Sequence, residues 1–94
     1  MNEQERAEAV NRAAEVKRIL EHPLFTAAVT DVRAAVLSAW SASALGAAAD
    51  REKLWMMDQM LVRVLRALRT HVETGKVAQA ELLRDKPRIM KVFG

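Results

Sequence analysis

Few side chains in this sequence are of the types that carry out chemistry. His22 and His71 are the only histidines, and cysteine is absent. Neither histidine has a second histidine or an acid at the spacing that places metal ligands on one helical face. Glu21 adjoins His22, but adjacent residues of a helix do not share a face. The sequence therefore predicts no catalytic residue, no metal site and no cofactor, and enzymatic activity is not expected.

Basic residues could instead bind phosphate. Residues 51–75 carry five bases and three acids, and residues 76–94 carry five bases and two acids, whereas residues 1–50 are slightly acidic. The candidate phosphate contacts are Arg63, Arg66 and Lys76. Such contacts would give weak, salt-dependent and non-specific DNA binding. Two other interpretations stay open: attraction between the unlike halves of two copies, and an ordinary solvated helix surface.

The elements that position these residues should all be helices. The chain of 94 residues is 51% hydrophobic but only 4% aromatic, and three glycines and two prolines leave long uninterrupted segments. Alanine, leucine, methionine, glutamate, arginine and lysine are strong helix formers. We expect an all-α fold in a single domain, residues 1–94. The apolar runs fall short of the roughly 18 to 20 residues of a membrane span, so a cytoplasmic protein without membrane association is expected.

Two helices are expected in the first half of the chain. The first fills the segment 1–22, running from residue 2 to about residue 21, and His22-Pro23 ends it because the residue before a proline avoids the α region. The second runs from about Pro23 to Ser43, and small residues around Gly46 mark a turn.

A third helix, capped by Asp50, is predicted from Arg51 to about Thr74, with Gly75 as its stop. Helices of similar length joined by a short turn form an antiparallel helical hairpin, so residues 23–75 should be the core. The residues expected to be buried there are Phe25, Val29, Val32, Val36, Trp40, Leu54, Met57, Leu61, Val64 and Leu68.

The last segment, residues 76–94, should hold a short helix and a tail. The short helix is predicted over 76–84, and Pro87 should end regular helix. The tail is apolar enough either to fold back on its own chain or to dock into a groove of a partner. The docking residues would be Arg88, Ile89, Lys91, Val92 and Phe93.

The third helix also carries a tryptophan outside its main apolar stripe. Trp55 and Val62 are seven residues apart and form a second narrow seam edged by Arg66 and Arg69. Three interpretations are open: another helix of the same chain covers the seam, a subunit or partner binds there, or Trp55 stacks on a nucleic-acid base. Tryptophan and arginine are enriched in protein interfaces, whereas base-stacking surfaces usually have several aromatic residues.

Four stretches resemble short helical proteins of tailed bacteriophages and gene-transfer elements, most similar in type to the phage small terminase subunit. They are ILEHPLF at 19–25, AVLSAW at 35–40, REKLW at 51–55 and HVETGKVA at 71–78. The resemblance spans roughly residues 16–80. It implies a ring-forming homo-oligomer in the host cytoplasm that regulates a large terminase subunit. Many members have an N-terminal helix-turn-helix domain, for which there is no room ahead of the predicted hairpin, so DNA selectivity should be weak or supplied elsewhere.

Two functional classes follow from these observations. The first is a non-enzymatic, homo-oligomeric assembly or adaptor protein of a DNA-packaging machine, with a large terminase-like protein as its partner. The alternative is a small phage-encoded nucleic-acid-binding or inhibitor protein. The first class predicts self-association and weak DNA binding, whereas the second predicts tight binding to DNA or to a host enzyme.

Overall fold

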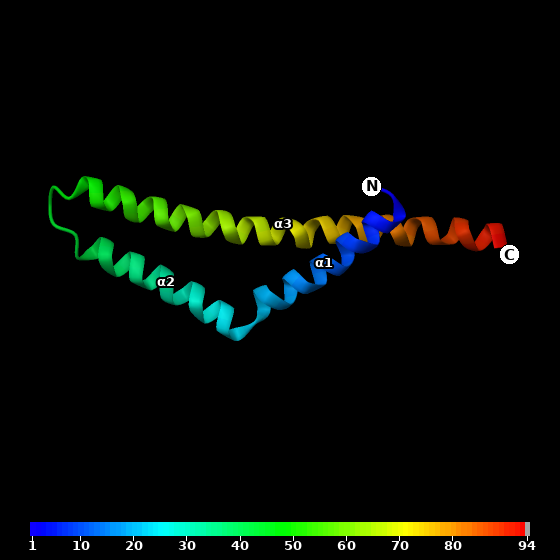
Figure 1. Cartoon of the computed structure of the whole chain (residues 1–94), viewed down its shortest axis with the longest axis horizontal. Coiled ribbons are helices and arrows are strands. Elements are labelled where there is room, and N and C mark those ends of the chain that lie inside the picture. The colour runs from blue at the N-terminus through cyan, green and yellow to red at the C-terminus, as the bar shows by residue number, and fades with distance from the viewer. Residues whose placement is uncertain (94) are drawn as a thin grey trace. The chain divides into compact units, whose positions relative to one another are not determined.

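The computed structural model describes the backbone of residues 1–93 and the side chains of residues 1–85. Its three helices hold 89% of the chain, and no strand occurs in residues 1–93. They are α1 (Glu3–Glu21), α2 (Pro23–Ser41) and α3 (Ala48–Phe93), coloured from blue to red along the chain in Figure 1. The predicted all-α class is confirmed.

The chain divides into two compact units. Unit 1 joins Met1–Ile19 to the part of α3 from Leu68 onward, and unit 2 is Leu20–Ala67. Unit 1 therefore packs most of α1 against the second part of α3. Unit 2 contains α2, the turn that follows it and the first part of α3.

The ends of α1 and α2 are fixed by local hydrogen bonds. The side-chain oxygen of Asn2 accepts a hydrogen bond from the backbone N–H of Glu5 at 2.8 Å, which caps α1. His22 has extended backbone angles and caps α2, because its Nδ1 accepts from the N–H of Leu24 at 3.1 Å. Pro23 follows at the first helical position, where its missing N–H costs nothing. The predicted break at His22-Pro23 is confirmed, and His22 has a structural role.

Unit 1 has a core of small side chains. Ala9, Val16, Gly75 and Ala78 are buried, and Ala13 is half-buried. A Cβ atom at Gly75 would collide with the Cβ of Ala13 and lie 3.1 Å from the backbone oxygen of Ala9. Small residues thus let α1 and α3 approach closely at this crossing.

This close approach corrects the prediction that Gly75 stops the helix. A stop glycine usually takes a left-handed conformation, whereas Gly46 is the one positive-φ residue of the described chain. α3 instead continues through Gly75 to Phe93, so the separate helix over 76–84 was also wrong. Pro87 lies within α3 and does not end it, since a proline removes one backbone donor but a helix can continue beyond it. The side chains of the predicted docking tail lie outside the described residues.

In unit 2, α2 lies beside the first part of α3, and the two are connected by residues 42–47 (Figure 1). Gly46 has a φ of 90° there, which a residue with a Cβ atom rarely adopts, and the predicted turn is present. α3 begins at Ala48, so Asp50 lies in its first turn and is not the cap that was expected. An acid in this position still interacts favourably with the helix dipole.

Burial in unit 2 is much lower than the apolar stripes predicted. Leu65, 8% exposed, is the only buried residue among residues 20–67. Two helices cover each other along one line only, so apolar residues on either side of that line keep much of their surface. Of the ten residues expected to be buried, Phe25, Val29, Val36, Leu54, Leu61 and Leu68 are half-buried, and Val32, Trp40, Met57 and Val64 are exposed.

Candidate functional site

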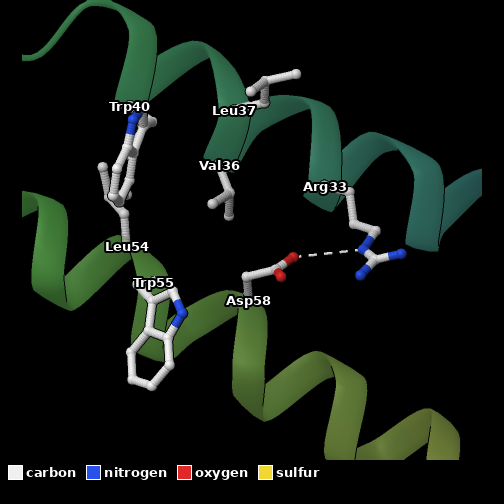
Figure 2. A pocket seen from close by; sticks show the side chains of 7 residues that line it. All are labelled: Arg33, Val36, Leu37, Trp40, Leu54, Trp55 and Asp58. Carbon is white, nitrogen blue, oxygen red and sulfur yellow. Dashed lines mark hydrogen bonds and ion pairs between the residues drawn. The ribbon is translucent and has the colours of Figure 1, made fainter.

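A shallow groove in unit 2, here called the tryptophan groove, contains both tryptophans of the chain. It is lined by Arg33, Val36, Leu37 and Trp40 of α2 and by Leu54, Trp55 and Asp58 of α3 (Figure 2). The guanidinium Nε of Arg33 lies 3.3 Å from a carboxylate oxygen of Asp58. This ion pair joins the two helices at one end of the groove, and Trp40 lies at the other end.

The side chains of the groove divide into two sets. Val36 and Trp40 point from α2 toward α3 (Figure 2), and Trp40 lines the same groove as Leu54. Leu37 points away from α3, and the ring of Trp55 points away from α2. Trp55 is 56% exposed and Trp40 is 43% exposed. Both indole rings therefore keep a large apolar area in contact with water.

A second hollow continues from Trp55 along α3. It is lined by Trp55, Met56, Gln59, Met60 and Arg63, all from the same helix. Met56 is 54% exposed and Met60 is 63% exposed. Glu52 borders Trp55 on the N-terminal side, where both line a further small hollow with Trp40. We call the surface formed by Glu52, Trp55, Met56, Gln59, Met60 and Arg63 the α3 face.

The predicted seam and the α3 face share Trp55. Val62 is half-buried and Arg66 is exposed, and Arg69 belongs to unit 1. The structure groups Trp55 with Met56, Met60 and Arg63 in one hollow rather than with Val62. The role of the predicted seam in assembly stays a prediction.

The three candidate phosphate contacts are divided between the two units. Arg63 lines the hollow beside Trp55, whereas Lys76 belongs to unit 1 and forms an ion pair with Glu73 at 3.1 Å. Arg66 is in unit 2 with Arg63. Phosphate binding by these three residues therefore stays a prediction.

Sequence reasoning missed the methionines of the α3 face. Met56 and Met60 were not assigned to either predicted surface, although they are as exposed as Trp55. The signal was present in the spacing, because Met56 and Met60 are four residues apart and so share one side of the helix. A search for the main stripe alone passes over such a second stripe.

Unit 1 also has a groove, lined by α1 and the second part of α3. Val10, Ala13, Ala14 and Val72 supply apolar side chains, and Lys17 and Lys76 supply charge. At the other side of the crossing, the Arg6 guanidinium lies 2.7 Å from a Glu81 oxygen and 3.7 Å from an Asp85 oxygen. These contacts hold α1 against α3.

Two other features are absent from the described part of the chain. No group of three or more histidine, cysteine, aspartate or glutamate side chains there is arranged to hold a metal ion. Within the same residues, no helix combines the length and the apolar character needed to cross a membrane.

Comparison with known proteins identifies no relative of this chain. No family model, curated protein or solved structure matches the chain.

Proposed function

We propose that this chain is a non-enzymatic assembly or adaptor protein that forms homo-oligomers through an α2–α3 helical hairpin. In its sharpest form, based on the resemblance to phage and gene-transfer proteins, it is a small terminase subunit that regulates the large subunit of a DNA-packaging machine. The C-terminal tail is then the candidate contact with that larger partner.

The observation that carries this proposal is the low burial of unit 2. Ten large apolar side chains of this unit keep more than two fifths of their surface exposed: Leu24, Val32, Leu37, Trp40, Leu45, Trp55, Met56, Met57, Met60 and Val64. Monomeric proteins expose single apolar residues, whereas contiguous apolar patches mark interaction sites. Removing such surface from water favours assembly by roughly 25 cal/mol per Å², from which the entropy lost on association is subtracted.

The residue types favour a protein partner over a nucleic acid. Tryptophan, methionine and arginine are enriched in protein interfaces, and all three occur in the hollow beside Trp55. Single-stranded nucleic acids are bound by several stacked aromatic rings in a basic groove. Asp58 and Glu52 instead place carboxylates beside the two tryptophans.

The proposal is tested by measuring the molar mass in solution. Trp55→Glu introduces a charge at the centre of the exposed surface and should weaken self-association by about 30-fold, the effect expected from losing an interface hot spot. Ala34→Glu is the matched control, because Ala34 is exposed on α2 and the substitution adds the same charge. Analytical ultracentrifugation of the wild type and both variants gives the three association constants.

Wild-type and Ala34→Glu proteins should be oligomers at micromolar concentration, and Trp55→Glu should dissociate. A wild-type protein that stays monomeric would overturn the proposal. Tight, salt-resistant binding of a monomer to DNA or to a host enzyme would favour the alternative class, a small nucleic-acid-binding or inhibitor protein.

A further inference from the structure

We infer that the α3 face binds the α3 face of a second copy in an antiparallel, two-fold symmetric contact. This inference rests on the proposed self-association and goes beyond it by naming the surface, the direction of the helices and the residue pairs.

The residues of the α3 face have a spacing that suits an antiparallel contact. Its residues stand at positions 52, 55, 56, 59, 60 and 63, with intervals of three, one, three, one and three. This series is the same in both directions along the chain. At 100° and 1.5 Å per residue, the six positions lie on one side of the helix over roughly 16 Å. An identical helix running the opposite way therefore presents the same pattern of contact positions.

The side chains that this symmetry brings together are chemically complementary. Glu52 of one copy faces Arg63 of the other, while Trp55 lies beside Gln59 of the second copy and Met56 lies beside Met60 of the second copy. Met56 faces Gln59 of the second copy across the symmetry axis. Each of these contacts occurs twice, as an isologous interface requires. The contact thus combines two ion pairs, at the two ends, with a centre of adaptable methionine side chains flanked by the tryptophans.

The surface is available for such a contact. Trp55, Met56 and Met60 are exposed, Gln59 is half-buried, and Glu52 and Arg63 are exposed. Five of the six residues line one hollow, which a methionine of the facing helix can enter. A flexible methionine side chain fits irregular hollows well.

Charge selects between the two directions of the helices. In a parallel, in-register pair, Glu52 would face Glu52 and Arg63 would face Arg63, so both ends would repel. The antiparallel pair replaces both repulsions by attractions. Electrostatic complementarity of this kind fixes the orientation and register of an interface.

A charge exchange tests the pairing. Glu52→Arg should weaken self-association by about tenfold or more because it creates two repulsive pairs, and Arg63→Glu should do the same. A one-to-one mixture of the two variants should form hetero-oligomers with at least wild-type affinity, since every pair in the mixed contact is complementary. The double variant Glu52→Arg/Arg63→Glu should recover most of the wild-type affinity. Arg12→Glu is the control, because Arg12 is exposed on α1 and lies outside both the α3 face and the tryptophan groove.

Cysteine cross-linking tests the register directly, because the wild-type chain contains no cysteine. Met56→Cys and Gln59→Cys proteins, mixed and oxidised, should form a disulfide-linked heterodimer in higher yield than Glu52→Cys forms with itself. A parallel contact would reverse this order.

The outcomes separate this inference from the proposed function. If the wild type is monomeric, both fail. The wild type can also be oligomeric while mixing the charge variants restores no affinity and cross-linking shows no preference for positions 56 and 59. In that case the inference fails and the assembly proposal stands. Recovery on mixing together with the expected cross-link supports both.

Discussion

Gly75 shows how a single residue decides the packing of unit 1. A glycine in the middle of a helix ordinarily costs about 1 kcal/mol relative to alanine, because it leaves the backbone freer in the unfolded chain. At this position a side chain would collide with Ala13 and press on the backbone of Ala9. The absence of a Cβ atom is therefore what lets α1 and α3 cross closely.

The first prediction is that Gly75→Ala destabilises the protein, although alanine has a higher helix propensity than glycine. The propensity gain of about 1 kcal/mol should be outweighed by an overpacking cost of about 1–3 kcal/mol. Urea unfolding followed by circular dichroism measures the change in the free energy of unfolding. The double variant Gly75→Ala/Ala13→Gly should lose less than the sum of the two single variants, because the two residues contact each other. An increase in stability for Gly75→Ala would contradict the close crossing.

The sequence alone could not assign this role to Gly75. A glycine at the end of an apolar stripe is typical of a helix stop, and local sequence does not distinguish that role from close packing. The distinction depends on Ala9 and Ala13, which lie more than sixty residues earlier. His22 differs, because the proline beside it made the helix boundary readable from local sequence.

At the scale of elements, α1 is held to α3 by Arg6 as well as by small apolar residues. Arg6 is largely shielded from water and contacts Glu81 at 2.7 Å and Asp85 at 3.7 Å. One arginine therefore compensates two carboxylates of the same helix. Such a partly buried ion pair is less screened by solvent than an exposed one.

The second prediction is that Arg6→Ala lowers the free energy of unfolding by about 1–2 kcal/mol. The loss combines the ion pair with packing of the arginine stem, and it leaves Glu81 and Asp85 to repel each other. Arg12→Ala is the matched control, because Arg12 is exposed on the same helix, and it should change stability by less than about 0.5 kcal/mol. Thermal and urea unfolding give both values, and equal losses in the two variants would refute the bridging role.

The helices themselves could largely be predicted, whereas their burial could not. Apolar periodicity and the His22-Pro23 break indicated α1 and α2 with nearly correct ends. The same periodicity placed Met57 and Val64 in the core, but both are exposed. Periodicity shows that a face is apolar and does not show whether the same chain covers it. Apolar residues of α3 that the chain leaves exposed, such as Met57 and Val64, therefore look like core residues in the sequence.

At the scale of the whole molecule, few of the described side chains are buried within a single copy of the chain. The buried residues are Ala9, Val16, Leu65, Gly75 and Ala78 among residues 1–85, and none is aromatic. A small core leaves little hydrophobic free energy to offset the conformational entropy lost on folding. We therefore expect assembly to contribute a large share of the stability of the folded chain.

The last prediction follows from this contribution of assembly to stability: the melting temperature should rise with protein concentration. For a dimer, each tenfold increase in concentration above the dissociation constant favours the folded assembly by about 1.4 kcal/mol, or about 0.7 kcal/mol per chain. For a chain of this length, that corresponds to a shift of roughly 3–6 °C. Circular dichroism melts over a hundredfold range of concentration measure the effect. Trp55→Glu should melt at a lower temperature that does not change with concentration, while Ala34→Glu should keep the wild-type dependence. A wild-type melting temperature that is constant over this range would show that the two units are stable without a partner copy.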